Sequence, residues 1–211
     1  MKVHLTTYFL LLFPSLAYPQ RLELFTSHSG QIVTNGLSER VPYGETTGYF
    51  DFLPGDQDPD SMLIRQPTYF VYFKLPYEVT ELGIRFISPV PPYAFAEAGD
   101  IVTELYELNK NSKLYFNPSI AVEQFIPASD TLPATWEELG RNEDSGEVMQ
   151  QPNGKATNAL LRLYSHPFPM ALYRVRITSG DKTIPQGSFL MQIGTLPGLK
   201  RMTLSRNPAE L

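Results

Sequence analysis

Apolar residues recur at every second position in short segments along this chain. In Leu172–Thr178, the apolar Tyr173, Val175 and Ile177 alternate with polar residues. Successive side chains of a strand point to opposite faces of its sheet, so this period indicates a half-buried antiparallel strand. Similar segments follow one another, separated by turns that carry many of the 19 Pro and 14 Gly residues. The pattern predicts an all-β fold, an antiparallel β-sandwich, over almost the whole chain.

The alternation predicts about nine short strands. Leu82–Ser88 is expected to be half-buried, with Leu82, Ile84 and Phe86 facing the core. Tyr69–Phe73 is apolar at every position, so we expect it to be central and covered on both faces. The remaining strands are predicted at Arg21–Phe25, Gly48–Phe52, Ile101–Tyr106, Ile120–Ile126, Leu160–Tyr164 and Ser188–Gly194.

Helix signals are sparse. Thr135-Trp136-Glu137-Glu138 fits a capping box, in which Thr135 and Glu138 satisfy each other's backbone donors, and Gly140 can end the helix. This predicts one short helix, or two at most, in the sandwich. Residues 127–154 around it are the most polar and irregular stretch, and we interpret them as a long insertion between two strands of one domain.

The N-terminus has the features of an export signal. Residues 1–17 combine Lys2, an apolar stretch from Tyr8 to Phe13, and the small residues Ser15 and Ala17 near the expected cleavage position. The apolar stretch is much shorter than the roughly 20 residues of a membrane span, and no other segment could cross a bilayer. We therefore predict a signal peptide over residues 1–17 and a single β-sandwich domain over residues 18–211.

Composition excludes several classes of function. There is no Cys, which removes disulfides, zinc–thiolate sites, cysteine nucleophiles and an N-terminal lipid anchor. The chain has 17 Lys+Arg against 22 Asp+Glu with no basic run, which argues against nucleic-acid binding. No glycine-rich phosphate loop or nucleophile elbow occurs. The expected location is periplasmic, on the outer surface or secreted, without a lipid anchor.

Two groups of charged residues are candidates for ligand contacts. Asp56, Asp58 and Asp60 alternate as carboxylates do in calcium loops, although a solvated turn is the simpler interpretation. Four arginines occupy outward positions of predicted strands and could form a cationic ladder for an anionic polymer: Arg85, Arg162, Arg174 and Arg176. We favour ion pairing with outward acidic residues such as Glu123.

Several short segments of the chain, taken in order, resemble the family of the major surface lipoprotein of leptospires. They are Pro42-Tyr43-Gly44, Tyr69 to Pro76, Leu82 to Pro89, Gly99-Asp100, Leu172-Tyr173-Arg174, Gly187-Ser188-Phe189 and Asn207 to Leu211. The resemblance implies a jelly-roll β-sandwich with a few inserted helices, no enzymatic activity, a calcium ion on an acidic loop, and binding to extracellular matrix. The family member has a lipidated cysteine and a long C-terminal tail, which this sequence lacks.

The resemblance also implies where calcium would bind. Matching by register places Asn117, with Pro118 beside it, at one pair of ligands, Glu143 and Asp144 in the acidic run, and Thr157 at a carbonyl position. One family carboxylate is replaced by the Asn117 amide. Because calcium affinity follows the number of carboxylates, we expect weak binding, on the order of 10⁻⁴–10⁻³ M.

These observations predict an exported, non-catalytic envelope or surface protein that acts by adhesion or ligand binding. Its expected partners are an extracellular-matrix protein or a polysaccharide, and its oligomeric state is open. One alternative is a secreted hydrolase that uses carboxylates of the insertion, such as Glu137 and Glu143. Another is a carbohydrate-binding module in which Tyr93 and Phe95 of the Pro-rich loop stack on sugar rings.

Overall fold

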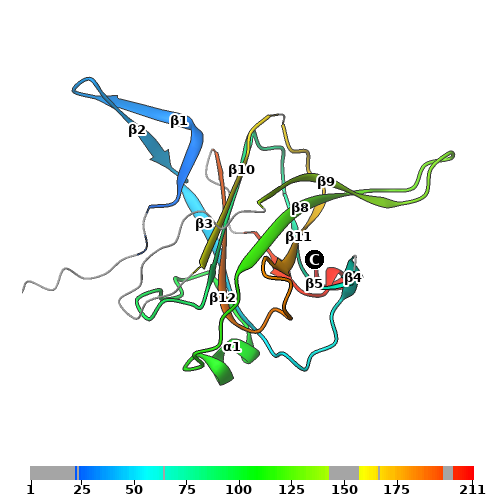
Figure 1. Cartoon of the computed structure of the whole chain (residues 1–211). Helices are drawn as coiled ribbons and strands as arrows, with labels where there is room; N and C mark the ends of the chain where they lie inside the picture. Colours follow the sequence, from blue (N-terminus) through cyan, green and yellow to red (C-terminus); the bar gives the residue numbers. More distant parts are fainter. Residues whose placement is uncertain (1–21, 23, 64, 143–156, 166, 197–201) are drawn as a thin grey trace, which may run out of the picture.

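The computed structural model describes residues 22, 24–63, 65–142, 157–165, 167–196 and 202–211. Strands dominate these residues, as Figure 1 shows. The strands are β1 (Thr26–Thr34), β2 (Leu37–Pro42), β3 (Glu45–Leu53), β4 (Ser61–Leu63), β5 (Gln66–Lys74), β6 (Glu81–Ser88), β7 (Ile101–Val102), β8 (Pro118–Ile126), β9 (Thr135–Asn142), β10 (Thr157–Leu163), β11 (Leu172–Ser179), β12 (Gly187–Leu196) and β13 (Leu204–Ser205). The helices are α1 (Glu104–Asn109) and the 3₁₀ helix η1 (Pro208–Glu210).

The strands form two large sheets and one separate hairpin. The first sheet has the order β10-β6-β12-β3-β7, and the second has the order β13-β5-β11-β8-β9 with β4 beside β5. Neighbouring strands are antiparallel, except for the short parallel pair of β3 and β7. The all-β sandwich predicted from the alternating sequence pattern is confirmed.

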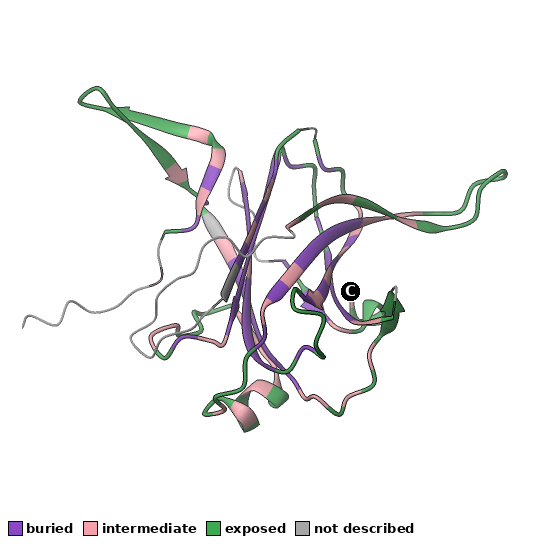
Figure 2. Cartoon of the chain, viewed as in Figure 1, coloured by how far each residue is buried: buried purple, intermediate pink, exposed green. Residues whose placement is uncertain are grey.

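One cluster of buried side chains joins the two sheets. On β11, burial alternates along the strand, and Tyr173, Val175 and Ile177 all enter the cluster. On the opposite sheet, Phe86 of β6 stacks on Phe189 of β12 with ring centroids 4.6 Å apart. The buried strands lie at the centre of Figure 2. Since burying one large apolar side chain contributes roughly 1.5–3 kcal/mol, this cluster is the main source of stability.

Strand β6 is more deeply buried than its sequence predicts. Every residue of β6 is buried, so the expectation that one face would meet solvent is wrong. The ring of Tyr43 covers its outer face at Gly83 and, on the neighbouring strand β12, at the register partner Gly194. Burial on both faces is correctly predicted for β5, in which residues 68–71 are all buried.

A hairpin near the N-terminus was not predicted. Strands β1 and β2 project from the sandwich in Figure 1 and are mostly exposed in Figure 2. Their turn places Asn35 at φ 54° and Gly36 at φ 79°, and an Asn-Gly pair is the usual sequence for such a turn. The strand expected at Arg21–Phe25 is absent from its described residues, Leu22, Leu24 and Phe25.

The segment predicted as a strand at Ile101–Tyr106 divides after two residues. Ile101 and Val102 pair with β3, and helix α1 then begins after Thr103. The Thr103 side chain accepts a hydrogen bond from the Tyr106 N–H at 3.1 Å, which is the geometry of an N-cap. The hydroxyl of Thr103 therefore ends the strand and starts the helix.

The helix predicted at Thr135 is a strand. Thr135–Asn142 forms β9, which pairs with β8 from Ile126 to Ile120. Trp136 packs against Phe125 of the neighbouring strand, with ring centroids 5.3 Å apart. Cross-strand packing thus overrides the local capping signal. Residues 135–142 of the predicted insertion therefore belong to the sheet. Residues 143–154 of the insertion lie outside the described residues.

Candidate functional site: an aromatic groove at the Pro-rich loop

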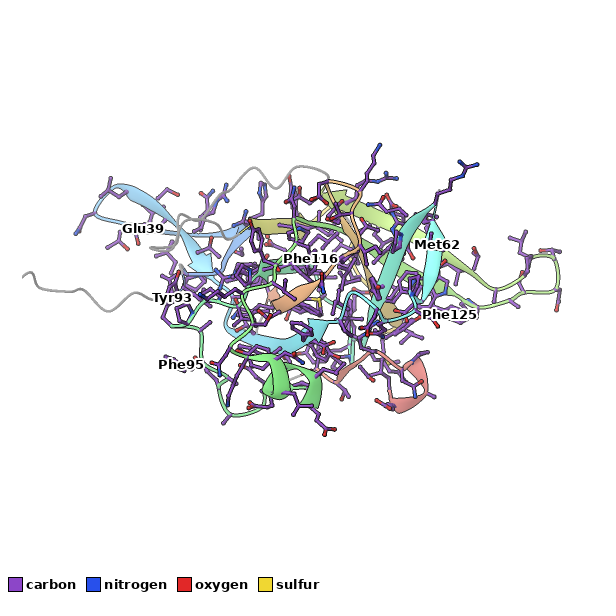
Figure 3. The ribbon with its side chains drawn as sticks, turned by 60° about the horizontal axis from the view of Figure 1, so that its bottom comes forward. Glu39, Met62, Tyr93, Phe95, Phe116 and Phe125 are labelled. Atoms are coloured by element: carbon purple, nitrogen blue, oxygen red, sulfur yellow. The ribbon has the colours of Figure 1, made fainter. Side chains whose placement is uncertain are left out.

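Residues 89–100, between β6 and β7, form a loop that is fixed to the first sheet. Asp100 holds it there, since its Oδ1 accepts the Gly48 N–H of β3 and its Oδ2 accepts the Glu97 N–H, both at 2.8 Å. The Ala94 N–H closes a turn on the Pro91 carbonyl at 2.9 Å. Tyr93 and Phe95, the two aromatic residues singled out in the sequence, are therefore carried on an anchored segment (Figure 3).

A groove runs along both sides of this loop, and we call it the Phe95 groove. One part, of about 440 Å³, lies toward the base of the β1–β2 hairpin, and the other, of about 430 Å³, lies toward α1. Phe50, Ala94 and Phe95 line both parts, so the two parts adjoin one another. Each part lies within the range of about 300–1,000 Å³ that is usual for ligand pockets.

Aromatic rings make up much of the groove. Phe95 is 78 % exposed, and Tyr93 beside it is half-buried. Figure 3 places both at the end of the molecule opposite Met62 and Phe125. The other rings that line the groove are those of Phe25, Tyr43, Phe50 and Tyr106. An aromatic side chain this exposed, lining both parts of the groove, marks a candidate contact with a ligand.

A buried arginine supports the floor of the first part. Arg85 is only 5 % exposed, and its guanidinium lies 5.0 Å from the centre of the Phe25 ring. Its Nε donates to the Gln192 Oε1 at 2.8 Å, and its Nη2 donates to the same oxygen. Both residues line the groove. Arg85 therefore fixes the orientation of the Gln192 carboxamide.

The second part of the groove depends on Asp51. Its Oδ1 accepts the Thr103 hydroxyl at 2.6 Å and the Phe52 N–H at 2.8 Å, which ties the start of α1 to β3. Burial raises the pKa of the Asp51 carboxyl above its usual range, although these hydrogen bonds oppose the shift. Tyr106 of α1 then packs on Phe50 with ring centroids 5.4 Å apart, forming the wall of the groove.

The residues expected to bind calcium are only partly described. Glu143 and Asp144 lie outside the described residues. Thr157 is the register partner of Ser88, and the Ser88 hydroxyl accepts the Phe116 N–H, one residue before Asn117. The structure thus brings the backbones of Asn117 and Thr157 to the same end of β6. Among the described residues, the Asn117 Oδ1 is buried and has no hydrogen-bond partner.

The alternative calcium residues follow β3. The Asp60 Oδ2 accepts the Phe70 N–H at 2.7 Å and lies 3.1 Å from the Arg206 Nη2, so this carboxylate has structural partners. Asp56 and Asp58 occupy the turn between β3 and β4. Within the described part of the chain, no three His, Cys, Asp or Glu side chains are grouped so that they could hold a metal ion.

The four outward arginines do not form a cationic ladder. Arg174 Nε lies 2.6 Å from the Glu123 Oε2, and Arg176 contacts both Glu123 and Glu138. Arg85 contacts Gln192, and the Arg162 Nε donates to the Thr26 carbonyl at 2.9 Å. The predicted pairing with Glu123 is confirmed for two of the four.

Comparison with known families identifies the chain. A family model described as a surface lipoprotein of the order Spirochaetales matches residues 37–202. The chain belongs to this family, Lipl32. A search among curated proteins finds no match. Membership confirms the resemblance noted in the sequence and indicates an exported protein of the outer surface. Among the described residues of this protein, no helix has the length and hydropathy needed to cross a bilayer.

The family is one of surface proteins, which argues against an enzymatic role. Of the carboxylates considered for hydrolysis, Glu137 is exposed on β9 opposite Gln124, and Glu143 lies outside the described residues. Neighbouring Glu138 is paired with Arg141 and Arg176, which lower the pKa of its carboxyl against the opposing effect of burial. A general acid needs a raised pKa, so Glu138 does not suit that role.

Proposed function

We propose that this protein is a non-catalytic adhesin that binds macromolecules through the Phe95 groove. The observation that carries the proposal is the 78 % exposure of Phe95, which lines both parts of the groove and is carried on an anchored loop. A large exposed ring on a rigid support can be buried by a ligand at little conformational cost. The surface location indicated by the family supports contact with external macromolecules.

The proposal is tested by solid-phase binding to collagen, laminin, fibronectin and a panel of polysaccharides. We expect saturable binding by the wild type to at least one of them. Phe95→Ala should lose about tenfold or more in affinity, because a central aromatic anchor is removed. Met62→Ala is the matched control, since Met62 is 56 % exposed and lies at the other end of the molecule. The absence of saturable binding by the wild type would remove the adhesin proposal.

We propose, second, that the protein binds calcium weakly through Asn117, Glu143, Asp144 and Thr157. The observation in favour is the Asn117 Oδ1, which is buried and unpartnered among the described residues. An amide oxygen of this kind is a normal calcium ligand, as are the carboxylates of the acidic run and a backbone carbonyl. In the folded chain, the ion would satisfy a polar atom that otherwise carries a desolvation cost.

The calcium proposal predicts stabilisation by mass action, because the ion binds the folded chain and not the unfolded one. The melting temperature should rise with millimolar calcium relative to EDTA in the wild type, and this rise should disappear in Asp144→Ala. A rise that persists in Asp144→Ala would instead place the ion at Asp56, Asp58 and Asp60. No rise in the wild type would leave these carboxylates as solvated loop charges.

A further inference from the structure

We infer that the ligand of the Phe95 groove is a neutral glycan. This inference rests on the proposed function and names the chemical class of ligand for the same site. It follows from four properties of the groove: its charge, the hydrogen-bonding groups on its floor, its aromatic residues, and the hydrogen bonding of the strand edge beside it.

The charge of the groove disfavours a polyanion. Its lining contains three carboxylates, those of Glu97, Asp100 and Glu107, against two cations, Arg85 and Lys110. Lys110 is ion-paired with Glu107 at 2.8 Å, and Arg85 is held by Gln192 and the Phe25 ring. A sulfated or uronic-acid polymer would meet excess negative charge here, whereas the hydroxyls of a neutral sugar carry no such cost.

The floor offers groups that recognise hydroxyls. The Gln192 Oε1 is occupied by Arg85, and among the described residues its Nε2 has no hydrogen-bond partner. A carboxamide fixed through its oxygen keeps two N–H donors for a ligand. The exposed Glu97 carboxylate of the same groove supplies an acceptor. Donor and acceptor together match a sugar hydroxyl, which both donates and accepts.

The aromatic residues supply the apolar contact. One face of a pyranose ring is lined by C–H groups and packs flat against an aromatic ring. Phe95 lies where the two parts of the groove meet, and Tyr93 lines the first part. A chain that crosses Phe95 can therefore place one sugar in each part. This arrangement suits a linear oligosaccharide better than a single small molecule.

The strand edge beside the groove argues against a peptide added to the sheet. Peptides that extend a sheet need free backbone groups on an edge strand. The backbone groups on the outer edge of β3 already have hydrogen-bond partners. The Gly48 N–H donates to Asp100, and the Phe50 carbonyl accepts the Thr103 N–H. Tyr49 and Phe50 also pair with β7. The groove therefore binds through side chains, as sugar sites do.

The experiment is affinity electrophoresis in native gels that contain neutral laminarin or hydroxyethylcellulose, with anionic alginate and heparin in parallel gels. We expect at least one neutral polysaccharide to retard the wild type, and the anionic ones to have no effect. Phe95→Ala should weaken the retardation by about tenfold or more. Leu108→Ala should not, because Leu108 is 74 % exposed on α1 but does not line the groove.

Gln192→Glu distinguishes ligand contact from folding. Glutamate keeps an oxygen for Arg85 but removes the amide donor, so glycan affinity should fall about tenfold while the melting temperature does not decrease. The inference is overturned if no neutral polysaccharide retards the wild type, or if Phe95→Ala binds as the wild type does. If a matrix protein binds in a Phe95-dependent way without any glycan binding, the adhesin proposal stands and the glycan inference fails.

Discussion

Glu81 is the carboxylate on which the N-terminal hairpin depends. It is fully buried at the start of β6 and accepts hydrogen bonds from the His28 N–H at 2.5 Å, the Ser29 N–H at 2.9 Å and the Tyr43 hydroxyl at 2.6 Å. The Ser29 hydroxyl also donates to it. Burial raises the pKa of Glu81, but these donors outweigh it and hold the pKa below its usual value of 4.5.

The lowered pKa of Glu81 predicts a loss of stability in acid. The unfolded chain binds a proton at a higher pH than the folded chain does, so this contribution is complete above the unfolded pKa and disappears as the pH falls through the folded one. The melting temperature should therefore drop between about pH 5 and pH 3. Glu81→Gln should lower stability at neutral pH by about 1–3 kcal/mol and flatten that part of the profile.

Thermal melts across this pH range check the prediction. Glu97→Gln serves as the control, because Glu97 is exposed. Equal acid sensitivity in Glu81→Gln and the wild type would show that other groups cause the acid effect.

The sequence predicts the interaction partner of a charged side chain only where both residues lie on the same face of one sheet. The ion pair between Glu123 and Arg174 is predictable, because the two residues occupy directly opposite positions on β8 and β11, where outward charges on adjacent strands meet. Glu81 was not recognised, since its partners lie 38 to 53 residues away, on segments whose position depends on the hairpin. Arg85 was expected on the surface, but Phe25 and the hairpin base bury it.

At the scale of elements, a stacked arginine connects β9 to the rest of its sheet. The Arg174 guanidinium lies 3.9 Å from the centre of the Phe70 ring of β5 and 4.1 Å from that of Trp136 of β9. With the Glu123 ion pair on β8, this side chain of β11 contacts β5, β8 and β9. A planar guanidinium between two rings is a contact that lysine cannot reproduce.

Arg174→Lys should therefore lower the free energy of unfolding by about 1–2 kcal/mol. Urea denaturation followed by fluorescence measures it, and Trp136 is the single tryptophan of the chain, so the signal reports on β9. Arg141→Lys is the control, because its side chain is 53 % exposed and its ion pair with Glu138 is a surface contact. That variant should change stability by less than about 0.5 kcal/mol. Equal losses in the two variants would contradict a role for the stack.

The same elements show why some boundaries were predicted and others were not. Period-two alternation identified β11, along which burial alternates, and β6, whose Leu82, Ile84 and Phe86 enter the core although its other face is covered as well. It failed at Thr135, where the capping box describes a local preference and the packing of Trp136 on Phe125 decides the outcome. At Thr103 the alternation predicts a strand, but a helix begins there. The Thr103 hydroxyl caps α1 and donates to Asp51 of β3, which is distant in the sequence. The Phe95 groove was predicted only as two aromatic residues, since its floor comes from β6 and β12.

At the scale of the whole molecule, two of the segments that carry the family resemblance are in contact. The Tyr43 ring, from Pro42-Tyr43-Gly44, lies over Gly83 of the β6 segment and over Gly194 of β12. Its hydroxyl reaches Glu81 at 2.6 Å. The Tyr43 ring thus joins the projecting hairpin to the outer face of the sandwich, and it also lines the Phe95 groove. These contacts require the absence of a side chain on both glycines.

Adding a single carbon at this contact tests how the hairpin is held. A Cβ at Gly83 would lie 2.5 Å from the Tyr43 Cε2, which is too close, so Gly83→Ala must displace the ring. We expect the free energy of unfolding to fall by about 1–3 kcal/mol, as in other overpacked sites, and proteolysis within the hairpin to become faster. In a Tyr43→Ala background the clash is absent, so the same change should cost less than about 0.5 kcal/mol. Urea denaturation of the four proteins in this cycle measures the coupling. Additive effects would show that the glycine serves the strand alone, and that the hairpin is attached to the sandwich by other contacts.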